Sequence, residues 1–274
     1  MRIVLNYAVW RLIVKEARSV IVYNQAMEVI DGQWFMEGLD GKDPSCIHSA
    51  EELLKVIREV GFLPLFSNNV TGFSVENMTD PSCWWCGDPA VDPWEWRAIL
   101  ARTGEVAYGK FFRNKAGYVS KKWFPEFANY RRDGYDFDSA YDDGKAGRKE
   151  KLIMDLFWPK EGEIWDAKEK TALYSNEVKE KAGFGKGGEK GFEGSCAKLQ
   201  MSSYLTVKDF RPRLNKKGEE YGWAVAIYTL PEYLWGYNYV TKSYKETPQD
   251  SYKKIIRHIR KNFDTDEDTV RKIV

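Results

Sequence analysis

The amino-acid sequence predicts an α+β protein, mainly helical, with tandem winged-helix-like units that carry β-hairpin wings. Residues 148–228 follow the order helix, helix, helix, β-hairpin, which is the order of a winged helix. Residues 93–132 repeat the combination of a helix and a hairpin in the first half. Hydrophobic residues make up 43% and charged residues 30% of the chain, as in folded proteins. The aromatic share of 15% is enough to fill a sizeable core.

Capping residues place the helix ends. Ser49 precedes two glutamates and an apolar run that stops at Gly61, which predicts a helix between these two residues. Asp92 followed by Pro93 is typical of an N-cap and a first helical position. The same signals and the apolar periodicity predict strands over 105–113, 118–120, 204–207 and 221–228, the last two joined by a turn-rich connection. They predict helices over 121–132, 148–158 and 176–182, a helix through 196–200, and polar helices over 250–274.

An acidic segment that contains glycines, residues 133–147, is the best candidate for a domain boundary. It lies between a first winged-helix-like unit, residues 46–135, and a second one, residues 148–235. Residues 1–45 form an N-terminal segment to which the sequence assigns no role. Residues 236–274 form a C-terminal helical segment.

The composition also limits the compartment and the partners. Charged residues interrupt the apolar runs near the N-terminus, and no run approaches the ~20 residues that cross a bilayer. Four cysteines in a chain of 274 residues do not form a dense disulfide framework. We therefore expect a cytoplasmic protein without a membrane partner, and the sequence indicates no obligate protein partner.

Positive charge is local, because the whole chain carries a net charge of only +1. Residues 97–132 contain nine basic and two acidic side chains, and residues 198–217 contain six basic and one acidic. Each of these two basic islands covers a predicted hairpin and a flanking helix, the parts of a winged helix that face DNA phosphates. The residues expected to contact nucleic acid are Lys110, Arg113, Lys115, Lys121, Lys122, Arg131, Arg132, Lys198, Lys208, Arg211, Arg213, Lys216 and Lys217. We expect both islands on one continuous face; the alternative is that these charges only keep surface hairpins soluble.

Four tryptophans are candidates for an aromatic pocket. Trp94 and Trp96 cannot share one face of a helix, so one is expected to pack in the core while the other is free. Trp84 and Trp85 lie just upstream in the chain. Exposed rings beside a carboxylate suit a flat, polar ligand such as a base taken out of its stack. The alternative is that all four rings only pack.

Asp92 and Glu95 are the candidate catalytic residues for cleavage of a glycosidic bond. A carboxylate beside that bond stabilises positive charge on the sugar or orients the attacking water. The alternative reading is structural. At the N-cap and at the third helical position, the two carboxylates would satisfy backbone N–H groups and take no part in chemistry.

Cysteine and histidine motifs predict neither a metal site nor a cofactor. Cys83-Trp-Trp-Cys86 stands alone in a loop, and we predict that it holds no metal, although Cys46 and His48 would complete a zinc-like set. A zinc nucleobase deaminase is excluded, because its His-x-Glu and Pro-Cys-x-x-Cys spacings are each one residue too long here. The glycine-rich residues 183–191 lack the Gly-Lys-Ser/Thr of a P-loop, so we expect a flexible connection there.

Four runs of the sequence carry a family resemblance: Gly61-Phe-Leu-Pro-Leu-Phe66, Asp92-Pro-Trp-Glu-Trp-Arg97, Ala107-Tyr-Gly-Lys-Phe-Phe112 and Lys217-Gly-Glu-Glu-Tyr-Gly-Trp223. In word order they resemble proteins described as AlkZ-related, bacterial relatives of the AlkZ-type DNA glycosylases. The resemblance covers residues 50–235 and leaves the N-terminal 45 and the C-terminal 35 residues outside. It implies tandem winged helices arranged as a C around double-stranded DNA, without a metal.

The resemblance also implies an activity, the removal of alkylated bases and the unhooking of interstrand crosslinks. The catalytic motif of these glycosylases is Gln-x-Gln or Gln-x-Asp. None of the glutamines in this sequence, Gln25, Gln33, Gln200 and Gln249, has Gln or Asp two residues later. We therefore expect a DNA-binding protein of base-excision repair whose fold and partner follow the family more closely than its chemistry. The alternatives are a non-catalytic winged-helix regulator and a small-molecule enzyme that uses the aromatic pocket.

Overall fold

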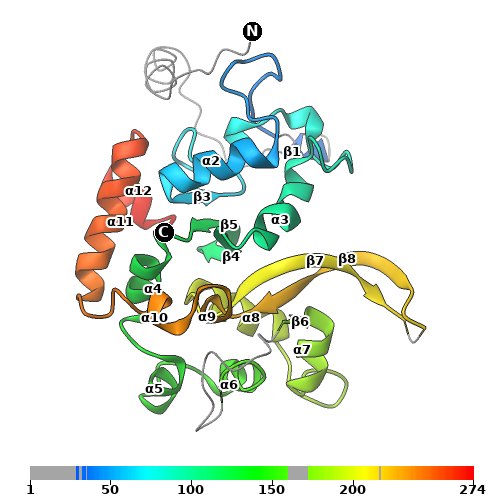
Figure 1. Cartoon of the computed structure of the whole chain (residues 1–274), viewed down its shortest axis with the longest axis vertical. Coiled ribbons are helices and arrows are strands. Elements are labelled where there is room, and N and C mark those ends of the chain that lie inside the picture. The colour runs from blue at the N-terminus through cyan, green and yellow to red at the C-terminus, as the bar shows by residue number, and fades with distance from the viewer. Residues whose placement is uncertain (1–28, 31–32, 35, 160–171, 216) are drawn as a thin grey trace.

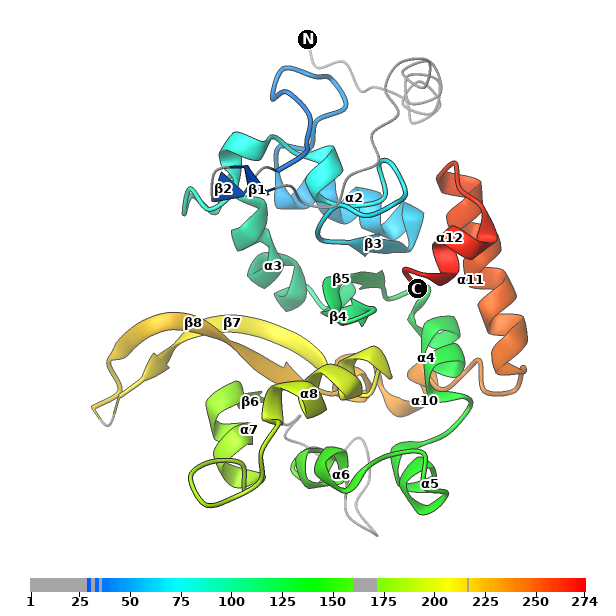
Figure 2. The ribbon, with the colours of Figure 1, turned by 180° about the vertical axis from the view of Figure 1, so that it is seen from behind.

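The computed structural model describes residues 29–30, 33–34, 36–159, 172–215 and 217–274 (Figures 1 and 2). Most of the predicted N-terminal apolar segment, and Lys216, lie outside these residues. The helices are α2 (Ala50–Val60), α3 (Pro93–Arg102), α4 (Phe124–Arg132), α5 (Phe137–Asp142), α6 (Arg148–Met154), α7 (Ser175–Lys181), α8 (Phe192–Met201), α9 (Pro231–Trp235), α10 (Tyr237–Val240), α11 (Pro248–Asn262) and α12 (Glu267–Arg271), with short 3₁₀ turns at Glu76–Met78 and Pro81–Cys83. The strands are β1 (Val29–Ile30), β2 (Gln33–Trp34), β3 (Phe62–Pro64), β4 (Val106–Phe112), β5 (Lys115–Ser120), β6 (Leu173–Tyr174), β7 (Thr206–Leu214) and β8 (Glu220–Thr229).

The predicted α+β class is confirmed, and six strands form one antiparallel sheet in the order β3-β5-β4-β7-β8-β6. The two predicted hairpins, β4–β5 and β7–β8, are therefore neighbours in a single sheet. Tyr108 of β4 pairs with Val207 of β7, and the Thr206 hydroxyl donates to the Tyr108 carbonyl oxygen at 3.0 Å. All three residues are buried, so the join between the hairpins belongs to the core.

Capping residues set both ends of α2 and the start of α3, as the sequence predicts. The Ser49 side chain accepts from the backbone N–H of Glu52, and Gly61 ends α2 at a φ of 78°. Asp92 is the N-cap of α3, and Pro125 lies in the first turn of α4, as predicted. The turn of the first hairpin is tighter than predicted, because Arg113 and Asn114, both at positive φ, make the reversal alone.

Two segments that the sequence indicated as connections contain regular secondary structure, and the reason is the same in both. The acidic linker 133–147 contains α5, whose Phe137 is fully buried. The turn-rich connection after residue 207 is instead the outer part of β7, which continues to Leu214 through Pro212. The pairing with β8 shifts register between Arg211 and Arg213, so the missing N–H of Pro212 is tolerated. In each case contacts with distant residues decide a conformation that local turn residues disfavour.

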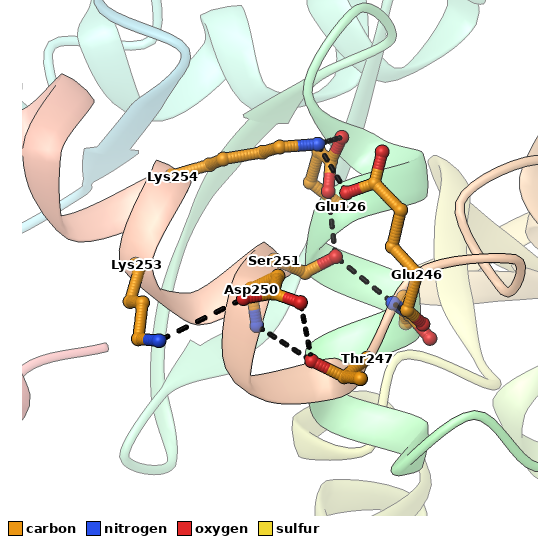
Figure 3. A network of polar contacts seen from close by, with 8 residues as sticks. Glu126, Glu246, Thr247, Asp250, Ser251, Lys253 and Lys254 are labelled. Atoms are coloured by element: carbon orange, nitrogen blue, oxygen red, sulfur yellow. Dashed lines mark hydrogen bonds and ion pairs between the residues drawn. The ribbon is translucent and has the colours of Figure 1, made fainter.

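The C-terminal helices pack onto the first half of the chain (Figures 1 and 2). Figure 3 shows the polar network between α11 and α4. The Ser251 hydroxyl donates to a Glu126 carboxylate oxygen at 2.6 Å and accepts from the Asn129 amide at 2.9 Å. The Lys254 ammonium binds Glu126 at 3.1 Å and also contacts Glu246. Residues 248–262 are thus part of the folded body, as the burial of Ile255 and Ile259 on the inner face of α11 also shows.

Among the residues that the structure describes, no helix has both the length and the apolar content required to cross a bilayer.

Candidate nucleic-acid interface

The first basic island is split between exposed and buried positions. Lys110, Lys115 and Lys122 are exposed on β4, on β5 and before α4. Lys121 is half-buried with its ammonium 5.5 Å from the centre of the Tyr239 ring. Arg113 is exposed and donates to the backbone carbonyl of Arg271 at 2.9 Å.

Arg132 was expected to contact nucleic acid, but its side chain is buried, so it does not belong to the interface. Its side chain is fully buried and forms an ion pair with Glu232 at 2.5 Å, while a second guanidinium nitrogen donates to the Ser203 carbonyl at 2.9 Å. A third contact runs from Nε to the Ser203 hydroxyl at 3.3 Å. Arg132 therefore joins α4, the turn after α8 and α9, and its guanidinium is already paired inside the protein.

The second basic island follows the β7–β8 hairpin. Arg211 and Lys217 are exposed, whereas Lys208 and Arg213 are half-buried. Asp209, the single acid of this island, pairs with Arg102 at 2.6 Å and with Arg211 at 2.7 Å. This carboxylate is buried and partly neutralises the positive charge at the base of the hairpin.

The hairpin projects from the body of the protein as a curved two-stranded ribbon (Figures 1 and 2). Near its tip the large apolar side chains are exposed: Leu214 by 52%, Tyr221 by 46% and Trp223 by 91%. Sequence reasoning missed these three residues as a contact surface. A local signal was present, because Tyr221-Gly-Trp223 places two rings on one side of a strand whose neighbours are charged.

The two islands meet at a cleft of about 320 Å³ between the end of α4, α5–α6 and α8. Arg131 of the first island and Lys198 of the second line it, together with Asp133, Lys145 and Glu150. Burial lowers the pKa of the Arg131 guanidinium, which donates to the Phe111 carbonyl at 2.8 Å. Lys198 is 70% exposed and lies 3.7 Å from Glu150. The islands therefore border the same cleft, and a continuous face across both remains a prediction.

The four tryptophans are not gathered around one pocket. Trp96 is fully buried and Trp84 is nearly so, which corrects their assignment to a ligand pocket. Trp94 is half-buried and packs against the edge of the core, so that one of the two rings is free to bind a ligand stays a prediction. Trp85 is 52% exposed, with its ring centre 6.1 Å from that of Trp94. The other face of Trp94 carries the Arg97 guanidinium, 3.1 Å from the ring centre.

Asp92 serves the backbone. Its carboxylate accepts from the backbone N–H groups of Trp94 at 2.8 Å, Gly87 at 2.9 Å and Trp85 at 3.1 Å, and the residue is fully buried. It thereby holds Trp85 at a φ of 59°, a left-handed conformation that a tryptophan rarely adopts. Because both oxygens are occupied, the structural reading of Asp92 replaces the catalytic one.

Glu95 differs from Asp92. It is half-buried, and within the described residues its carboxylate has no hydrogen bond or ion pair. The capping contact back to Asp92 that the sequence suggested is absent from the N-terminus of α3. Glu95 is thus the one of the two candidate carboxylates that is free to act on a ligand.

The cysteines remain thiols. Cys83 is half-buried and Cys86 is exposed, while Cys46 is buried and its pKa is raised to about 11 by burial and by the nearby Asp80. The described part of the chain holds no group of three or more His, Cys, Asp or Glu side chains placed to bind a metal ion. The absence of zinc stays a prediction that elemental analysis can check.

A family model described as "AlkZ related" matches residues 47–274. The match includes the C-terminal helices, which the sequence resemblance had left outside. Curated proteins and solved structures give no match.

Proposed function

The chain belongs to the AlkZ-related family, and on this premise we propose that it binds double-stranded DNA, with the β7–β8 hairpin as its principal contact. The observation that carries this proposal is the exposed Trp223 on the outer half of β8, in a ribbon that projects from the protein. An aromatic ring 91% exposed to water gains free energy when a partner covers it. Aromatic side chains stack on bases or wedge between base steps, and the flanking Arg211 and Lys217 can reach phosphates.

We also propose the finer organisation. Residues 46–135 and 148–235 are two winged-helix-like units that share one sheet through β4 and β7, and the protein acts in base-excision repair of alkylated bases or crosslinks. The small-molecule alternative is weaker, because Trp84 and Trp96 are buried side chains that a flat ligand cannot stack on. The other alternative is a regulator that binds DNA without catalysis, and an assay of base release distinguishes it from a glycosylase.

The hairpin is tested with the Trp223→Ala variant. We expect its affinity for a labelled 20-base-pair duplex, followed by fluorescence anisotropy, to fall by about tenfold, since one stacked ring contributes ~1–3 kcal/mol. The melting temperature should not change, because the ring makes few contacts within the protein.

Trp85→Ala is the matched control, since it removes another exposed tryptophan outside the hairpin. It should leave the affinity for this undamaged duplex unchanged, because no damaged base is present there for an aromatic pocket to receive. If the parent protein binds no duplex at low salt, the proposed function is wrong. If Trp223→Ala binds as tightly as the parent, the hairpin is not the contact.

Base excision would depend on Glu95. Its carboxylate is unoccupied and lies on α3, which packs against β7 at the base of the hairpin. We expect Glu95→Gln to slow the release of bases from alkylated duplex by about 100-fold, the scale of losing one electrostatic group at a reacting centre. The melting temperature should stay the same. Absence of release by the parent protein, measured as alkali-labile sites, would leave DNA binding without catalysis.

A further inference from the structure

The outer half of the β7–β8 hairpin contains an irregularity on β8. Arg211 of β7 pairs with Val225 of β8. Two positions further along β7, Arg213 pairs with Tyr221, which lies four positions before Val225. A single residue of β7 therefore faces residues 222–224 of β8, whereas a regular antiparallel ladder places one residue against one. The two extra residues form a β-bulge on β8.

Trp223 is the middle residue of this bulge. The structure describes every residue of β7, and none of them pairs with Trp223. A side chain on a two-stranded ribbon is normally covered by its cross-strand neighbour, and without one the Trp223 ring is 91% exposed. Gly222, just before it, has a φ of 73°, a left-handed conformation that glycine adopts without steric cost. The backbone irregularity thus turns the ring outward, as bulges do beside functional sites.

Neighbouring side chains hold the bulge in place. The Arg213 guanidinium carbon lies 5.2 Å from the centre of the Tyr221 ring. A Cβ atom at position 222 would lie 3.4 Å from Nη2 of Arg213, so the guanidinium also lies against the Gly222 backbone. The tip is therefore ordered before a partner arrives, and such preorganisation reduces the entropy that a contact costs.

The tip is poorly suited to pairing with another β-strand. Among the described residues, no third strand pairs with residues 209–214 of β7 or 220–226 of β8. Pro212 has no N–H to donate on the first strand, and the bulge interrupts the ladder on the second. Both features discourage strand addition at an open edge. The partner that fits this tip is one that receives a flat ring.

The charges around the ring favour a polyanion. Residues 211–223 contain four basic and two acidic side chains. Arg211 and Lys217 are exposed, and so is one of the acids, Glu220. The other acid, Glu219, accepts a hydrogen bond from a neighbouring side-chain amide at 2.8 Å. DNA combines negative charge with flat bases that receive an aromatic ring.

We propose that Trp223 is a wedge that enters a DNA duplex between neighbouring bases and selects duplexes whose stacking is already weakened. This inference rests on the proposed function for its partner and adds how that partner is bound. Parting two stacked bases costs free energy, and the cost is smallest where a base is mismatched or damaged. A protein that must open a step therefore binds a weakened duplex more tightly than a perfect one, even without hydrogen bonds to the bases.

The test compares a fully paired duplex with the same duplex carrying one central mismatch. We expect the parent protein to bind the mismatched duplex about tenfold more tightly, since the mismatch spares part of the unstacking cost. A 2-aminopurine placed beside the mismatch should become brighter on binding, because its fluorescence rises when it is unstacked. Trp223→Ala should lose both effects at concentrations that saturate the DNA, whereas Trp223→Phe, which keeps a flat ring, should retain part of both.

Gly222→Ala examines the bulge itself, because it keeps the tryptophan but strains the backbone that aims it. This variant should still bind DNA, with a smaller preference for the mismatch than the parent has. The matched control is Leu214→Ala. Leu214 is 52% exposed at the same tip but is regularly paired with Glu220, so its loss should leave the preference unchanged.

The possible failures are distinguishable. A parent that binds both duplexes equally, without brightening, would place the ring on the DNA surface; the wedge would be wrong and DNA binding would stand. Failure to bind either duplex at low salt would overturn the proposed function itself. Sedimentation gives a third outcome. If Trp223→Ala turns a dimer into a monomer and leaves DNA binding unchanged, the ring belongs to an interface between two copies of the chain, and the wedge is again wrong.

Discussion

Replacing Arg132 with Met is expected to lower the free energy of unfolding by about 3–5 kcal/mol, the cost typical of breaking a buried ion pair. The variant leaves the Glu232 carboxylate, fully buried as a side chain, without its cation. It also removes the donor to the Ser203 carbonyl, at a residue held in a left-handed conformation with φ 60°. Urea denaturation of the parent and variant measures the difference.

The double variant Arg132→Met/Glu232→Leu separates charge from packing. Removing both charges should recover part of the loss, because no uncompensated carboxylate remains. If Arg132→Met lowers the free energy of unfolding by less than about 1 kcal/mol, Glu232 is solvated in the variant. In that case the ion pair does not hold α4 and α9 together.

Replacing Asp92 with Ala is expected to cost about 2–4 kcal/mol, because three backbone N–H groups lose their acceptor at once. The loop that presents Trp85 should lose its conformation as well. The measurement is again the free energy of unfolding, combined with the fluorescence of the tryptophans around the loop.

Glu95→Ala on the same helix is the control for Asp92. Its carboxylate has no partner within the described residues, so the change in stability should stay within about 0.5 kcal/mol. An Asp92→Ala variant that keeps the stability of the parent but loses base release would restore a catalytic role for Asp92.

Local patterns in the sequence predict the elements well where a residue acts on its own neighbours. Ser49 and Asp92 mark helix starts because their side chains cap N–H groups two or three residues away. The separation of Trp94 from Trp96 follows from helical geometry alone. The hairpins were also predictable, because β-prone runs on either side of turn residues pair locally.

Counting charges in the sequence found the two basic islands, but it could not tell which of their side chains are exposed and which are buried. Arg132 and Arg131 are adjacent in the chain and belong to the same basic cluster. Arg132 is buried against Glu232, a residue 100 positions later, whereas Arg131 is only half-buried, although both lie beside the same cleft. No local signal separates them, because the partner of a buried charge is chosen by the packing of distant elements.

The sequence by itself determined the α+β class, the ends of α2, the start of α3, the two hairpins and the family. Tertiary structure alone decided that the hairpins join in one sheet through Tyr108 and Val207. It also decided that β7 extends through Pro212 and that the Trp223 side chain, on β8, is left exposed. The physical reason is the range of the interactions. Caps and turns act over a few residues of chain, whereas strand pairing and burial depend on segments that lie far apart in sequence and meet only in the folded protein.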